Sequence, residues 1–225
     1  MKRMKNVVLT CLFLFCLGAS PRTPLGIPLD APWKQKIYNI AHTKFIHPAW
    51  GWQHSERNYL LAEKLAEKDG IAIDRDVLFA AAFLHDMSAF MPCKDTKMEH
   101  GDCAAQQSGA ILRAAGFPMQ KLGAVQAAER GHMYYSDPGS QPEAIVLHDA
   151  DSLDFLGDIG AARLISLVGE SGPSFDRTLA ALKEMADKIP PRLLTRSGKA
   201  MGEARAKEVR DFIDRAQAEE AVNPH

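Results

Sequence analysis

Apolar residues recur at helical spacing along almost the whole chain from Ala31 onward. Glycine, proline and aspartate interrupt this pattern at intervals of about one helix length, and no segment shows the convincing apolar and polar alternation of a half-buried strand. The pattern predicts an all-α protein. We expect helices over residues 33–44, 55–68, 75–86, 101–115, 118–131, 143–156, 161–168, 175–188 and 199–220.

Several residues mark the ends of these helices. Asp74 is typical of an N-cap, because its side chain can accept from the free amides of the first turn. Gly70 and Gly116 stand where a helix should stop. Pro142 stands where the helix over 143–156 should start. Residues 133–142 read as a turn-rich loop, and there are no internal repeats.

The dyad His85-Asp86 follows an apolar run, residues 77–84, that has no polar face. A helix that is apolar on every side is expected to be wholly buried. An isolated charge in such surroundings costs several kcal/mol unless it is paired or bound to a metal. The dyad therefore predicts charged or metal-binding partners on neighbouring helices.

Further ionisable side chains share a helical stripe with apolar residues, which places them on inward faces. They are His54, His100, His132 and Asp151. Asp149 also lies on an apolar stripe, so spacing alone does not choose between the two aspartates. The other histidines are interpreted as ordinary core or surface residues: His42, His47, His148 and His225.

Buried imidazoles and carboxylates together suit a hard or borderline divalent ion, namely Mn, Fe, Zn, Ni, Co or Mg. One ion would take His54, His85, Asp86 and Asp151. If Asp86 bridges, a second ion would take His100 and His132, and the pair would clamp an attacking water and phosphoryl oxygens. We therefore expect one or two divalent ions inside a helical bundle.

Four stretches of the chain resemble the HD superfamily of metal-dependent phosphohydrolases, in its small single-domain form. The resemblance covers roughly residues 45–215. The stretches are His54-Ser-Glu-Arg57, Ala81-Ala-Phe-Leu-His-Asp86, His100 with Ser108–Leu112 and Gly116-Phe-Pro118, and Asp149-Ala-Asp-Ser-Leu-Asp154 with Gly157, Gly160 and Arg163.

The resemblance implies an HD-domain helical bundle over residues 45–220, preceded by a lead-in helix within 21–44. It also implies roles for the site residues. Those matching the family's basic metal set are His54, His85, Asp86 and Asp151, and the family's Asp-x-Leu placement selects Asp151 over Asp149. The positions of His100 and His132 imply a second ion, or help with substrate phosphate and proton transfer. The catalytic candidates are thus Asp86, His100 and His132.

Three basic residues are candidates for phosphate contacts: Arg57, Lys94 and Arg130. The alternative for each is a surface salt bridge.

The N-terminus has the layout of a secretory signal. Lys2, Arg3 and Lys5 precede an apolar run over residues 7–17, and small residues follow at 18–20. We expect cleavage after Gly18 or Ala19, with export to the periplasm and no membrane span in the mature chain. The alternative is an uncleaved N-terminal anchor. Removal of residues 1–20 leaves 24 basic and 28 acidic residues, which gives no nucleic-acid footprint.

Two cysteines remain after signal removal, Cys93 and Cys103. Disulfides persist in an exported protein, so these two cysteines are candidates for a bridge. Two free thiols are the alternative.

The leading functional hypothesis is a phosphohydrolase that acts on a nucleotide or other phosphate ester through metal-activated water. The absence of a Gly-Tyr-Pro signature after the dyad argues against cyclic-di-GMP as the substrate. Two alternatives stay open: an HD-fold di-iron oxygenase, and a non-catalytic binding or sensor module that retains a metal. The sequence leaves substrate, metal identity and oligomeric state open.

Overall fold

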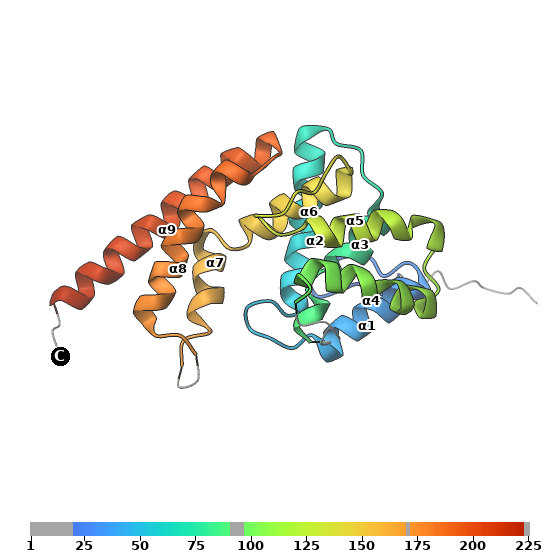
Figure 1. Cartoon of the computed structure of the whole chain (residues 1–225), viewed down its shortest axis with the longest axis horizontal. Helices are drawn as coiled ribbons and strands as arrows, with labels where there is room; N and C mark the ends of the chain where they lie inside the picture. The colour runs from blue at the N-terminus through green and yellow to red at the C-terminus, as the bar shows by residue number, and fades with distance from the viewer. Residues whose placement is uncertain (1–19, 91–96, 170–171, 223–225) are drawn as a thin grey trace, which may run out of the picture.

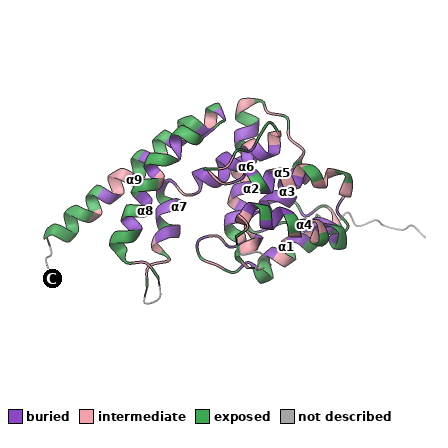
Figure 2. Cartoon of the chain, in the orientation of Figure 1, coloured by how far each residue is buried: buried purple, intermediate pink, exposed green. Residues whose placement is uncertain are grey.

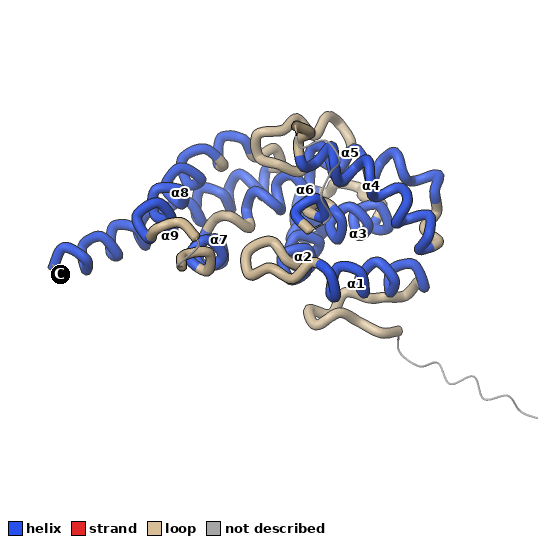
Figure 3. The backbone as a smooth tube through the Cα atoms, turned by 60° about the horizontal axis from the view of Figure 1, so that its bottom comes forward, coloured by secondary structure: helices blue, strands red, loops and turns tan. Residues whose placement is uncertain are grey.

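The computed structural model describes residues 20–90, 97–169 and 172–222. These residues form α-helices and short 3-10 turns without a β-strand, as Figure 3 shows; a single isolated bridge joins Arg22 and Pro28. The all-α prediction is confirmed. The α-helices are α1 (Pro32–Lys44), α2 (Trp52–Asp69), α3 (Arg75–Leu84), α4 (His100–Ala115), α5 (Leu122–Gly131), α6 (Pro142–Leu153), α7 (Gly157–Ile165), α8 (Phe175–Lys188) and α9 (Arg196–Val222).

Helix α3 is central to the bundle. Every residue from Val77 to Leu84 is buried, and α1, α2, α5 and α6 pack around it (Figures 1 and 2). The Asp74 side chain caps its first turn by accepting from the amides of Asp76 and Val77. An apolar helix with a good cap and neighbours on all sides is the arrangement that its sequence predicts.

Several helix boundaries differ from the sequence prediction by two to four residues. Helix α6 ends at Leu153 rather than at residue 156, and α7 begins at Gly157 rather than at 161. The chain extends at Leu156 and then takes a left-handed conformation at Gly157, with φ of 71°, which glycine adopts without strain. The predicted helix over 118–131 is a 3-10 turn, Met119–Lys121, followed by α5.

Helices α7, α8 and α9 stand beside the group formed by α1–α6 (Figure 1), and α9 packs against α2, α6, α7 and α8. The lead-in segment is part of the main core, because Trp33 packs edge-on against Phe79 of α3, with 5.5 Å between ring centroids. Among the described residues, no helix is both long and apolar enough to cross a bilayer. Residues 1–19 of the predicted signal lie outside the described residues.

Candidate metal centre

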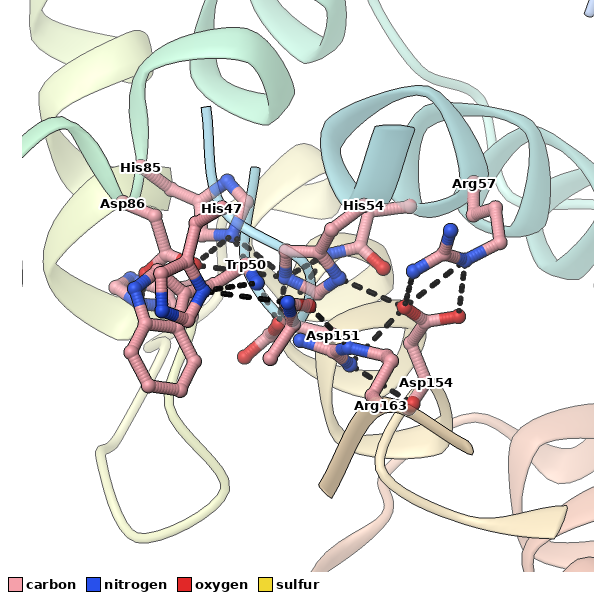
Figure 4. A network of polar contacts seen from close by, with 12 residues as sticks. His47, Trp50, His54, Arg57, His85, Asp86, Asp151, Asp154 and Arg163 are labelled. Atoms are coloured by element: carbon pink, nitrogen blue, oxygen red, sulfur yellow. Dashed lines mark hydrogen bonds and ion pairs between the residues drawn. The ribbon is translucent and has the colours of Figure 1, made fainter. Parts of the chain in front are cut away.

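Five helices bring the predicted ligands to one place inside the bundle. One comes from within α2, one from within α6, and the others from the ends of α3, α4 and α5. They are His54 on α2, His85-Asp86 directly after α3, His100 at the start of α4, His132 directly after α5, and Asp151 on α6. Figure 4 shows several of these side chains turned toward one another.

The first group, called the buried set here, consists of His54, His85 and Asp151 with one oxygen of Asp86. His54 Nε2 lies 2.9 Å from Asp151 Oδ1, 3.3 Å from His85 Nε2 and 3.5 Å from Asp86 Oδ2. Two ligands that each lie about 2.1 Å from a shared ion stand roughly 3 Å apart. The spacing of this set therefore fits one divalent ion.

The second group, called the open set here, consists of His100 and His132 with the other oxygen of Asp86. The two histidine Nε2 atoms are 2.9 Å apart, and they lie 3.8 and 3.7 Å from Asp86 Oδ1. Asp86 thus presents Oδ2 to the buried set and Oδ1 to the open set. A carboxylate divided in this way suits a bridge between two ions.

Each histidine of the two sets is held by its other ring nitrogen. This is the usual support of a metal-binding imidazole, because an Nδ1–H that donates outward leaves the Nε2 lone pair facing the ion. The Nδ1 partners are the Asp154 carboxylate for His54 (2.7 Å), the Ala82 carbonyl for His85 (2.9 Å), the Glu99 carboxylate for His100 (2.8 Å) and the Glu129 carbonyl for His132 (2.6 Å).

Asp154, the partner of His54, is itself held by two arginines. Arg57 donates from Nε and Nη2 to its two oxygens, at 3.0 and 2.8 Å, and Arg163 Nη1 lies 3.0 Å from Oδ2. Burial would raise the pKa of Asp154, but the contact with His54 and the two arginines lower it to about 2. Asp154 is therefore a fixed anion that orients His54.

The candidates for phosphate contacts have different positions. Arg57 is engaged with Asp154, and Arg130 Nε lies 3.3 Å from Asp102 in a half-exposed ion pair. Both thus make ion pairs, the alternative considered for them. Lys94 lies outside the described residues.

The structure separates the two aspartates that helical spacing could not. Asp149 accepts hydrogen bonds from the amides of Leu194 and Thr195 and from the Thr195 hydroxyl, at 2.7–3.1 Å. Its carboxylate joins α6 to the start of α9, whereas Asp151 faces the histidines. Asp149 is therefore placed as a structural acceptor.

The electrostatics of the centre favour a positive charge beside its carboxylates. Burial would lower the pKa of His85, but Asp86 and Asp151 raise it well above its usual value. Burial would raise the pKa of Asp86 and Asp151, but the neighbouring His54 and His85 lower both, so the carboxylates are charged. Burial, with the nearby charge of His85, lowers the pKa of His132 to about 4, so its imidazole is neutral at pH 7. A cation would satisfy both features at once.

Sequence reasoning gave no role to several residues that the structure places next to the ligands. Asp154 is the last residue of the Asp149–Asp154 stretch that resembles the HD superfamily, and no other sequence feature indicated it. Arg163 belongs to the same resembling region, and its side chain joins Asp154 to the loop before α2. Glu129 gave no signal; its carboxyl group is buried, accepts from Ser108 at 2.7 Å and leaves Oε1 without a hydrogen-bond partner.

Cys103 is buried on α4 and is disulfide-bonded, so it is no metal ligand. Cys93, the partner expected from the sequence, lies outside the described residues.

The fold agrees with comparisons to known proteins. The family model described as HD domain matches residues 51–156, which run from the turn before α2 to the residue before α7. This chain contains an HD domain. The matched range includes every one of the six side chains of the centre. HD domain proteins bind divalent metals, and the donor set found here fits such ions.

Solved structures support the same fold. A protein from an uncultured Thermotogales bacterium, described as a predicted HD superfamily hydrolase, is 26% identical, with a TM-score of 0.60 over 84% of this chain and 93% of that one. A Lactobacillus plantarum protein is 22% identical, with a TM-score of 0.61 over 84% of this chain and 97% of that one. Bacillus subtilis YpgQ, solved in complex with ADP, is 20% identical, with a TM-score of 0.58 over 85% and 98%. No curated protein matches the chain.

Proposed function

We propose that this HD domain is a metal-dependent phosphohydrolase that acts on a nucleotide or another phosphate ester. The observation that carries the proposal is the position of Asp86, whose two carboxylate oxygens face separate sets of histidines. Two ions bridged by a carboxylate are a recurring device for phosphoryl transfer, because they stabilise both the attacking and the leaving oxygen. The hydrolase description of the Thermotogales protein and the ADP bound to YpgQ support the same reaction class.

The protein's own residues divide the work between the two sets. Divalent ions held there would supply Lewis acidity and a more acidic water. The buried set fixes its ligands by hydrogen bonds inside the core, whereas His100 has a third of its side chain exposed and is held by Glu99. The substrate phosphate is therefore expected on the side of His100, where an ion held by the open set would bind it.

The test is a phosphate-release screen with controlled metal content. The protein is stripped with a chelator, reloaded separately with Mn, Fe, Zn, Ni, Co or Mg, and assayed on nucleotides and phosphomonoesters. We expect release that depends on the metal and disappears in Asp86→Asn. Asp102→Asn is the matched control, because Asp102 belongs to a half-exposed ion pair near His100.

The outcome also separates the competing functions. A fully metallated protein that releases no phosphate from any ester would contradict the proposal. An iron-loaded protein that instead consumes oxygen with an organic substrate would indicate the oxygenase, for which the same six ligands are suited. A metallated protein inactive in both assays would indicate a binding or sensor module.

We also propose that the protein is exported, on the basis of the sequence at residues 1–20. Expression of the full chain in a bacterium, followed by fractionation and N-terminal sequencing, tests this. The expected mature protein begins at residue 19 or 20 and is released with the periplasm; a full-length cytoplasmic protein would contradict it.

A further inference from the structure

A short segment between α1 and α2, residues 45–51, packs next to the metal centre. Phe45 stacks on Phe90, with ring centroids 5.0 Å apart, and His47 meets the same ring edge-on at 6.5 Å. Phe90 lies four residues after Asp86, on the turn that follows the dyad. The segment therefore lies against the part of the chain that carries the bridging carboxylate.

The segment is also tied to the support of His54. Arg163 donates from Nε to the carbonyl of Ala49 and from Nη1 to the carbonyl of Asp154, and its Nη1 also pairs with the Asp154 carboxylate. Arg163 is buried, and its guanidinium lies over the Phe155 ring at 4.5 Å. One rigid cation thus fixes both the 45–51 segment and the carboxylate that orients His54.

The ring of His47 has a defined orientation within this segment. Its Nδ1 accepts from the amides of Ala49 and Trp50, at 3.2 and 3.3 Å. An Nδ1 that accepts twice carries no hydrogen, so the remaining hydrogen is on Nε2. Burial and the charge of Arg163 lower the pKa of His47, although the charge of Asp86 acts in the opposite direction. The lowered pKa favours the same neutral form. His47 is therefore a fixed donor at Nε2.

His47 and Trp50 form a stacked pair that is half-buried rather than sealed. Their ring centroids are 3.8 Å apart and the planes are inclined by 17°. Within the described part of the chain, Trp50 has no aromatic partner other than His47. Figure 4 shows the pair on the side of Asp86, away from Arg57. Asp86 and His100 are also the most exposed ligands, with 20% and 33% of their side chains accessible.

We infer that His47 and Trp50 form the substrate-recognition lip of the metal centre, with His47 donating from Nε2 to an oxygen of the substrate and Trp50 contacting a planar ring of its organic group. The inference rests on the proposed phosphohydrolase function and narrows its substrates to phosphate esters of planar ring systems, such as nucleotides. Neither residue is a metal ligand, so the lip acts on substrate binding alone.

The inference has consequences that differ between the two residues. Loss of the His47 donor removes one hydrogen bond to a charged oxygen, which should raise KM about 10- to 100-fold for every phosphate ester. Loss of Trp50 removes a stacking contact, which should raise KM about 5- to 100-fold for nucleotides only. Esters without a ring, such as glycerol phosphate, should keep their KM in the Trp50 variant.

The experiment compares His47→Ala, His47→Gln and Trp50→Ala with His42→Ala. His42 is the matched control, because it is an exposed histidine whose ring also lies against a tryptophan, Trp52, at 4.7 Å. Each protein is assayed for kcat and KM on a nucleotide and on glycerol phosphate, for ADP binding by calorimetry, and for metal content. We expect unchanged metal content throughout, raised KM and weaker ADP binding in the lip variants, and partial rescue in His47→Gln.

Several outcomes would overturn the inference. If His47→Ala and Trp50→Ala keep the KM and the ADP affinity of the wild type while the wild type hydrolyses esters, the lip is wrong and the proposed function stands. If either variant loses its metal, the residue acts on the centre and the recognition role is wrong. If the metallated wild type hydrolyses no ester, the proposed function fails, and the inference fails with it.

Discussion

The buried set and the open set use the same kinds of ligand but differ in how they are supported. His54 and His85 have 1% and 0% of their side chains exposed, and the first is held by a carboxylate that two arginines fix. His100 has 33% exposed and is held by Glu99, whose own side chain is 37% exposed. Hydrogen-bonded ligands inside a packed core are preorganised, whereas partly exposed ones adjust to what binds.

The difference indicates a division of roles. A buried set with fixed ligands should bind its ion tightly and retain it, and an open set should exchange its ion and meet the substrate. Asp86 belongs to both sets, so it couples them. The comparison leads to four predictions, from the largest expected effect to the smallest.

Substitution of the shared ligand should have the largest effect. Asp86→Asn removes a charged oxygen from each set, so we expect both ions to be lost or weakened and the metal-dependent rate to fall by more than about 100-fold, since even outer partners of metal ligands contribute about 10- to 100-fold. Metal content by mass spectrometry and phosphate release measure this. Retention of two ions with full activity would show that Asp86 does not join the sets.

One ligand from each set should give different losses. His85→Ala is expected to remove the tightly held ion and with it all activity, whereas His100→Ala should leave one ion per chain and lose the second. Metal titration by calorimetry distinguishes the two, with wild type showing a tight and a weaker phase. Identical titration curves for the two variants would contradict the division into sets.

The outer support of the buried set should matter by an intermediate amount. Asp154→Asn removes the anion that orients His54 and leaves Arg163 without its charged partner, so we expect metal affinity to fall about 10- to 100-fold. Asp149→Asn is the matched control on the same stretch of chain. It should lower the free energy of unfolding by about 1–3 kcal/mol, because Thr195 loses its acceptor, with metal affinity unchanged. Equal metal affinities for both variants would be evidence against the role of Asp154.

The smallest effect on metal binding is expected for Glu129, whose carbonyl supports His132 in the open set and whose carboxyl group acts on stability instead. Burial raises the pKa of its carboxyl to about 8, against the hydrogen bond from Ser108 and the charge of His85. The unfolded carboxyl loses its proton near pH 4.5, so between these values the folded state holds a proton that the unfolded state lacks. Stability from this group is therefore complete below pH 4.5 and is lost as the pH rises toward 8.

Denaturant unfolding of chelator-treated protein at pH 5 and pH 8 measures this effect. Glu129→Gln stays neutral at both values, so its free energy of unfolding relative to wild type should increase from pH 5 to pH 8. Glu56→Gln, another buried glutamate, serves as the control. A difference between Glu129→Gln and wild type that does not change with pH would contradict the account of Glu129.

Much of the fold could be predicted from the sequence because it depends on local patterns. The apolar run of α3 and its Asp74 cap indicated a buried helix that ends at the dyad, and the structure has both. The boundary between α6 and α7 was harder to predict. It depends on the conformation at Leu156 and Gly157, and the periodicity of apolar residues continues through that turn.

The candidate site could be predicted from the sequence only in part. Inward-facing positions on helices predicted His54, His100 and His132, and the apolar run before the dyad predicted His85. Spacing left Asp149 and Asp151 equivalent. What separates them is a contact with Thr195, 46 residues away in the chain, which no local pattern contains. His47 was interpreted as an ordinary histidine for the same reason, because its orientation depends on the backbone of a loop.

The central claim is that one carboxylate, Asp86, joins two metal-binding sets. The most direct measurement is a crystal structure of the manganese-loaded protein with anomalous scattering recorded for the metal. The account predicts two peaks about 3.5–4 Å apart, one beside His54 and His85 and one beside His100 and His132, with Asp86 between them. A single peak that leaves one set without metal, or peaks away from Asp86, would contradict it.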